Sequence, residues 1–227
     1  MTLMLDDFSL DQWQARVSDR QRFEGGRLVR GVTVRGAADD FETTAALARA
    51  LDRLVGATIS HAPVRLRLHP GRSLPVRLRS FTRETLPGAT SGAFALELEA
   101  THPWEEGDAD TEQVASVTGN GVATTIEMAG TLAATLRLSF LASSPVMLPR
   151  FGDGRHTLLY FGLVPAGSVL VVDAGPRRAW LDGEEATSQV SGDYLMVYPS
   201  ATPISVDADM GAPPSGTLTL SWRDRWL

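Results

Sequence analysis

The sequence predicts a mainly β protein with two sandwich-like domains, the first of which also carries a single α-helix. In short segments along most of the chain, apolar residues occupy every second position, and only one segment has helical periodicity. An acidic stretch rich in turn-forming residues interrupts this pattern near the middle. We place the domain boundary there, which gives an N-terminal domain over residues 1–108 and a C-terminal domain over residues 109–227.

The helix is predicted at residues 41–55, where small and apolar residues recur three and four positions apart. Asp39 and Asp40 come directly before it, where carboxylates cap the first turn and interact favourably with the positive end of the helix dipole. Gly56 follows and favours termination. The pattern is typical of one helix packed on a sheet.

The N-terminal domain contains three segments that alternate between apolar and charged or small residues, at 64–68, 74–79 and 94–99. This alternation is typical of antiparallel strands that bury one face. Pro70 and Gly71 separate the first two segments and predict a tight turn between them.

The C-terminal domain is predicted to be a β-sandwich, because its strands are short, regularly spaced and bounded by Gly, Pro, Asp or Ser. Asp182 and Gly183 predict a hairpin turn. In the last strand Leu218, Leu220 and Trp222 share one face and should be buried in the core. The predicted strands cover residues 122–128, 132–141, 156–161, 168–173, 177–181, 194–198, 204–207 and 217–223.

Residues 102–113 contain five acidic residues together with Pro103 and Gly107, and they are predicted to form a linker or an exposed loop. A calcium loop is the alternative interpretation of this run. It lacks the ordered ligand spacing and the closing glutamate of an EF-hand.

The composition excludes several kinds of chemistry. The chain has no cysteine, so disulfides, thiol nucleophiles and thiolate metal sites are absent. Its formal net charge of -6 argues against a general nucleic-acid binder, and no stretch approaches the roughly 20 apolar residues of a membrane span. All 21 basic residues are arginines, as a GC-rich coding sequence would produce, and arginine also supplies planar, bidentate cations to interfaces.

The sequence predicts no enzyme, no metal site and no cofactor site. Its four histidines lie far apart without metal-ligand spacing, and nucleophile-elbow, P-loop and dinucleotide-binding motifs are missing. Two alternatives stay open. A carbohydrate-binding sandwich would use Trp104 or Trp180 as a sugar platform, and a glycan hydrolase would need two carboxylates that the fold brings together.

Two sets of residues are candidate interface residues. Arginines project from two neighbouring strands, where they are predicted to pair with Glu97 and Glu99, to dock an acidic neighbour, or to contact DNA. At the C-terminus, Trp226 and Leu227 are apolar where a free tail is normally polar, so we expect them to pack on the protein or on a neighbouring subunit. The arginines are Arg65, Arg67, Arg77 and Arg79.

The order of several local patterns resembles the siphophage distal tail protein family, often called Dit. In the first domain these are the segment 27–36, which resembles the opening strand before the helix, and the segment 96–104, which ends in a proline and an aromatic residue. His102 stands where the family pattern leads us to expect aspartate. The second domain contributes the Asn120-Gly121 start, the middle strands and hairpin at 165–183, and the final strand at 217–226.

This resemblance implies a non-enzymatic virion protein without cofactors. The N-terminal domain would assemble into a ring, expected to be hexameric, and a galectin-like C-terminal sandwich would project outward. The ring would lie at the distal end of a long non-contractile phage tail, after synthesis in the host cytoplasm. Implied partners are further copies of the chain, the tail tube protein, the baseplate hub or tail-tip protein and the tape measure protein. DNA would pass through the lumen without specific binding, and no membrane is involved.

Overall fold

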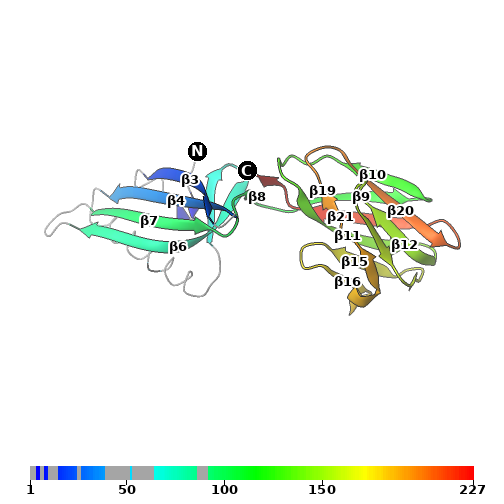
Figure 1. The fold of residues 1–227 in the computed structure, drawn as a ribbon. Coiled ribbons are helices and arrows are strands. Elements are labelled where there is room, and N and C mark those ends of the chain that lie inside the picture. The colour runs from blue at the N-terminus through cyan, green and yellow to red at the C-terminus, as the bar shows by residue number, and fades with distance from the viewer. Residues whose placement is uncertain are drawn as a thin grey trace. The chain divides into compact units, whose positions relative to one another are not determined.

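The computed structural model describes residues 4–5, 8–9, 15–24, 27–38, 52, 64–85 and 92–227. Its contacts divide the chain into two compact units, here called unit 1 (Met1–Asp108 with Leu227) and unit 2 (Ala109–Trp226). Antiparallel sheets form both units (Figure 1), which confirms the predicted mainly β class. The helix predicted at residues 41–55 lies outside the described residues apart from Asp52, and it stays a prediction.

Unit 1 contains one hydrogen-bonded sheet with the strand order β2-β1-β5-β6-β7-β4-β3, and β8 also pairs with β6. Its strands are β1 (Met4–Leu5), β2 (Phe8–Ser9), β3 (Arg16–Glu24), β4 (Arg27–Ala38), β5 (Val64–His69), β6 (Arg72–Thr85), β7 (Gly92–Ala100) and β8 (Glu105–Gly107). The three predicted strands and the turn at Pro70-Gly71 are confirmed, and Gly71 takes the left-handed conformation of such a turn with φ 72°.

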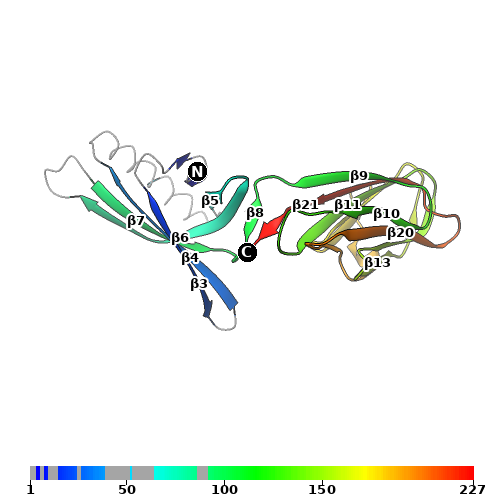
Figure 2. The same ribbon diagram turned by 90° about the horizontal axis from the view of Figure 1, so that it is seen from above.

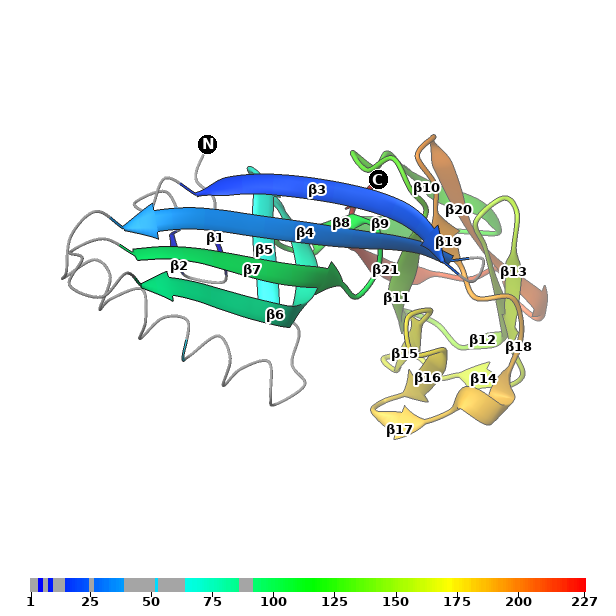
Figure 3. The same ribbon diagram turned by 60° about the vertical axis from the view of Figure 1, so that its left-hand side comes forward.

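The sheet of unit 1 bends within β6. This strand pairs with β5 near its start and with β7 along the rest of its length, and its register to β7 shifts between Leu78 and Ser80. Such a bulge bends a strand and increases its twist. Consequently β5 runs across the direction of β4 and β7 (Figure 3), and the apolar faces enclose a common core. That core contains Leu5, Val32, Val34, Val64, Leu66, Leu68, Leu74, Val76, Phe94, Leu96 and Leu98.

Strand β3 is not among the strands that the sequence predicts. All nine of its residues are exposed, so it lacks the apolar alternation that marks a half-buried strand. It forms because β4 offers it a continuous partner, from the pair Arg16–Arg35 to the pair Glu24–Arg27.

Unit 2 is a β-sandwich, as predicted. One sheet has the order β10-β20-β12-β13-β18 with β14 on β12, and the other has the order β17-β16-β15-β11-β21-β9 with β19 on β11. Phe140 on β11 and Phe151 on β12 meet edge to face across the sandwich, with ring centroids 5.9 Å apart. The strands are β9 (Thr111–Val117), β10 (Gly121–Ile126), β11 (Ala134–Ala142), β12 (Val146–Gly152), β13 (Thr157–Tyr160), β14 (Leu163–Val164), β15 (Val169–Asp173), β16 (Arg178–Leu181), β17 (Glu184–Glu185), β18 (Val190–Gly192), β19 (Met196–Val197), β20 (Thr202–Met210), β21 (Gly216–Trp222) and β22 (Arg225–Trp226).

Two predictions about unit 2 are confirmed in detail. Leu218, Leu220 and Trp222 are at most 4% exposed, so the final strand buries the expected face. Asp182 and Gly183 connect β16 to β17 with φ angles of 52° and 86°, the left-handed pair that a tight two-residue hairpin requires.

The interpretation of residues 102–113 as a linker or exposed loop is wrong for the strand residues of this stretch, whereas the boundary between the two units does fall within it, between Asp108 and Ala109. β8 lies within this stretch, and β9 begins at Thr111. Glu105 on β8 is only 4% exposed. An acidic side chain can be buried there because Arg30 and His69 of unit 1 supply it with hydrogen-bond partners.

Candidate interaction surface

The arginines of β5 and β6 lie opposite the buried apolar residues, as predicted. Val64, Leu66 and Leu68 are buried in the core, while Arg65 and Arg67 alternate with them along β5. Strand β7 joins the same sheet next to the later part of β6, so its carboxylates come within reach of that strand. The two pairs of arginines therefore have different neighbours.

One of the predicted cross-strand ion pairs is present. Arg79, at the bulge of β6, forms an ion pair with Glu99 on β7, and Arg77 is the register partner of the same glutamate. Glu97 instead accepts a hydrogen bond of 2.7 Å from the hydroxyl of Ser80. The ion-pair interpretation is thus confirmed for Arg79.

Arg65 and Arg67 do not reach Glu97 and Glu99, because β5 and β7 lie on opposite sides of β6. Arg65 donates to the hydroxyl of the buried Ser73 over 3.2 Å. In Arg67 the Nε atom lies 3.4 Å from a carboxylate oxygen of Asp108. A role of the four arginines in docking a neighbour stays a prediction.

The C-terminal residues Trp226 and Leu227 differ in their surroundings. The indole nitrogen of Trp226 donates to the carbonyl of Ala129 over 3.2 Å, and Arg225 forms a β-bridge with Leu132. Leu227 is 62% exposed on this chain. The packing of Leu227 on a neighbouring subunit therefore also stays a prediction.

A buried charged cluster holds the β3–β4 hairpin against β8, and the sequence did not indicate it. Arg30 on β4 is 5% exposed and donates from two nitrogens to the carboxylate of Asp19 on β3, at distances down to 2.6 Å. The same guanidinium donates to Glu105 over 2.9 Å and to the carbonyl of Pro103 over 3.2 Å. Only the fork of an arginine reaches all three acceptors at once.

The other oxygen of Glu105 lies 2.8 Å from Nδ1 of His69, at the end of β5. Because a carboxylate can only accept, Nδ1 carries the hydrogen in this contact. Burial by itself lowers the pKa of Arg30, but the hydrogen bonds and charges of Asp19 and Glu105 raise it above its usual value. Arg30 therefore stays charged and balances the two carboxylates.

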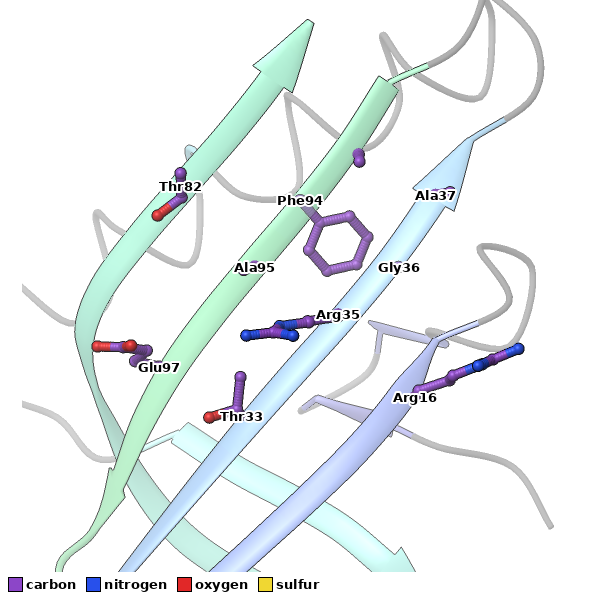
Figure 4. Close-up of a pocket in the computed structure, with 10 residues that line it drawn as sticks. Arg16, Thr33, Arg35, Gly36, Ala37, Thr82, Phe94, Ala95 and Glu97 are labelled. Atoms are coloured by element: carbon purple, nitrogen blue, oxygen red, sulfur yellow. The ribbon is translucent and has the colours of Figure 1, made fainter.

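A groove of about 730 Å³ lies on the outer face of the unit 1 sheet (Figure 4). Its floor is formed by Ala37 on β4 and by Ala93 and Ala95 on β7, which alternate with core residues and so face away from the core. Gly36 and its register partner Phe94 also border the groove, although the Phe94 side chain is only 3% exposed and belongs to the core.

Charged and polar side chains surround this floor. Arg35 extends over the sheet toward β7, Arg16 extends from the edge strand β3, and Glu97 and Thr82 lie on the other side (Figure 4). Arg16 and Arg35 are register partners, and like charges placed directly opposite each other are unfavourable. Among the described residues neither guanidinium has an acidic partner within ion-pair distance.

In unit 2, a second charged cluster surrounds Asp153, which is 1% exposed. One carboxylate oxygen accepts from the backbone N–H groups of Arg155 and His156, and the other accepts from Met196 N–H and from Nδ1 of His156. Burial by itself raises the pKa of Asp153, but the hydrogen bonds lower it by a larger amount. The pKa of Asp153 is therefore below its usual value. Aspartate often accepts hydrogen bonds from the backbone N–H groups two and three positions later in a turn. Asp153 followed by Gly154 is the local sequence signal that could have identified this site.

Neither cluster is a candidate metal site. Within the described ranges, no group of three His, Cys, Asp or Glu side chains could hold a metal ion. In the same part of the chain, no helix has the length and apolar character needed to cross a membrane. Trp104, a proposed sugar platform, stacks on His102 with ring centroids 4.4 Å apart. Trp180, the other, is only half-exposed within β16.

Comparison with known proteins identifies a fold. No protein-family model and no curated protein sequence matches the chain. Among solved structures, it is similar to the Dit protein (gp 19.1) of phage SPP1, described as a paradigm of the hub adsorption apparatus in phages that infect Gram-positive bacteria. The match has a TM-score of 0.69 at 15% sequence identity and covers 100% of this chain and 99% of the Dit chain. The resemblance drawn from the sequence is thus confirmed at the level of the fold, which this chain shares with SPP1 Dit over its whole length.

Proposed function

We propose that this protein is a structural component of a phage virion that forms a ring at the distal end of a long non-contractile tail. The ring, expected to be hexameric, joins the tail tube to the baseplate or tail-tip hub. Unit 1 forms the ring, and unit 2 is the outer, galectin-like domain. The observation that carries this proposal is the full-length similarity in fold to SPP1 Dit.

The distribution of charge supports an assembly through unit 1. Residues 1–108 contain 14 arginines and 15 acidic residues, a net charge of -1, whereas residues 109–227 contain 7 arginines and 12 acidic residues, a net charge of -5. Copies that meet through unit 1 therefore bring together their nearly neutral parts. A ring with this overall sign would repel DNA and would not retain it in the lumen.

The carbohydrate-binding alternative gains no support from the tryptophans proposed for it. One face of Trp104 is stacked on His102, and its indole nitrogen lies 3.4 Å from a Glu106 oxygen. A sugar platform needs an open aromatic face. Trp104 and Trp180 are both only partly exposed, and we propose neither as a sugar-binding residue.

The test is the oligomeric state of the full-length protein and its place in a virion. Native mass spectrometry and electron microscopy of the purified chain should show a closed ring around a central channel. A map of the phage particle should place the ring between the tail tube and the tip. A ring found only on the particle still supports the proposal, whereas isolated copies along tail fibres contradict it.

A further inference from the structure

One end of unit 2 carries no charged residue, and it is here called the uncharged end. Four turns meet there, at residues 118–120, 143–145, 165–168 and 211–215. Each turn lies within a longer segment that contains no Asp, Glu or Arg, although unit 2 as a whole has 7 arginines and 12 acidic residues. These segments are 113–126, 138–149, 157–172 and 210–222.

Hydrogen bonds hold the four turns of the uncharged end together. The contacts are Ser143 N–H to the Ser215 carbonyl (2.8 Å), Gly167 N–H to the Ala142 carbonyl (2.8 Å) and Ala208 N–H to the Asn120 side-chain oxygen (2.9 Å). Figure 2 shows β9, β10 and β20 lying lengthwise in unit 2. Because Val117 pairs with Gly216 at the uncharged end, Thr111, where the chain enters unit 2, lies at the other end of β9.

The strands carry exposed apolar side chains close to these turns. Met147 is the register partner of both Leu163 on β14 and Met210 on β20, so three apolar side chains lie next to one another across three strands. Met147, Leu163 and Met210 are 40%, 44% and 60% exposed, and Leu141, next to the 143–145 turn, is 42% exposed. An exposed apolar patch that is rich in methionine and free of charge is characteristic of a protein-binding surface.

The border of the uncharged end is acidic. Asp207 and Asp209 lie near the end of β20, and Asp182 accepts a hydrogen bond from Val169 N–H directly after the 165–168 turn. Arg150 neutralises part of this charge, since it forms ion pairs with Asp207 and Asp209. The border keeps a negative charge, as unit 2 does as a whole.

This charge determines which partner fits. A second copy has the same acidic border, so two uncharged ends repel each other when they approach. An anionic lipid surface is repelled as well, and the four segments contain no basic residue to bind its headgroups. We propose that the uncharged end of unit 2 binds another protein, through apolar side chains of that protein that are flanked by lysine or arginine. The inference concerns unit 2 alone and does not depend on a ring.

Selection from a random peptide library on the immobilised full-length chain tests this partner chemistry. The selected peptides should combine apolar residues with lysine or arginine, and their affinity should fall as salt rises, because the acidic border contributes to binding. Met210→Glu and Leu163→Glu should each weaken binding at least about tenfold, as expected for damage to an interface anchor. Both residues are exposed, so the melting temperature should stay unchanged.

Ala201→Glu is the matched control. It adds the same charge to an exposed residue directly before the other end of β20, about 30 Å from Met210, and should bind the peptides like wild type. The proposal is wrong if the selected peptides lack basic residues or bind Met210→Glu as tightly as wild type. It is also wrong if the chain instead dimerises, or binds phosphatidylserine vesicles, in a way that Met210→Glu abolishes.

A photocrosslinker at Leu163 tests the same surface in a particle that carries the chain. It should link to an apolar segment with neighbouring lysine or arginine in a different virion protein. Links only to copies of this chain, or no links, contradict the proposal and leave the proposed function standing. If particles lack the chain, the proposed function fails, and the peptide selection decides this inference separately.

Discussion

Asp153 shows how one side chain can stabilise unit 2. Its carboxylate accepts four hydrogen bonds, three of them from backbone N–H groups, and it connects the turn after β12 to β19. Asp153→Ala leaves buried donors without acceptors, so the free energy of unfolding of unit 2 should fall by about 3 kcal/mol. Urea denaturation followed by tryptophan fluorescence measures this, with the exposed Asp193→Ala as the matched control.

The same carboxylate predicts a pH dependence. The pKa of Asp153 is lower in the folded protein than in the unfolded chain, so its stabilising contribution is fully present above the unfolded value of about 3.9. It is lost as the pH falls through the lower pKa of the folded state. Wild type should therefore lose more stability than Asp153→Ala when acidified below about pH 4, and parallel stability curves for the two proteins would contradict this explanation.

The Arg30 cluster acts between elements, because it holds the β3–β4 hairpin to β8. Arg30→Met preserves much of the side-chain volume but leaves Asp19 and Glu105 without their cation. Removing one partner of a buried ion pair costs about 3–5 kcal/mol. Hydrogen exchange should accelerate in β3, β4 and β8, whereas the exposed Arg20→Met on the same hairpin should have little effect. Unchanged protection in Arg30→Met would mean that strand pairing alone holds the hairpin.

At the scale of elements, the sequence predicted strands that have one buried face and missed those that lack this pattern. β5, β7 and β21 alternate clearly and were found. β3 has no buried face, and β8 is acidic, so both resemble loops. β12 contains Pro149 and Gly152, which normally argue against a strand, yet it pairs with both β13 and β20. Hydrogen bonding to neighbouring strands stabilises β3, β8 and β12, although the local sequence of each does not favour a strand.

The interaction surface was harder to predict than the strands, for a related reason. The sequence pointed to alternating arginines, and β7 does bring Glu99 to Arg79. The buried cluster joins Asp19, Arg30 and Glu105, which lie up to 86 positions apart, and the groove combines side chains from four strands. Neither has a local spacing that a sequence pattern could reveal, because each brings together residues from separate strands.

For the whole molecule, the overall charge makes a prediction about assembly. Each chain carries -6, so six copies would carry about -36, most of it on unit 2. At 10 mM salt the Debye length is about 30 Å and neighbouring copies repel each other, whereas at 150 mM it is about 8 Å and this repulsion is screened. If apolar contacts between copies drive assembly, the ring should form at several-fold lower protein concentration at 150 mM than at 10 mM salt. Sedimentation velocity across this range measures the shift.

Glu112→Gln with Glu184→Gln, both exposed on unit 2, should assemble better at low salt and respond less to added salt. A ring that weakens steadily as salt rises would show instead that ion pairs dominate the contact between copies.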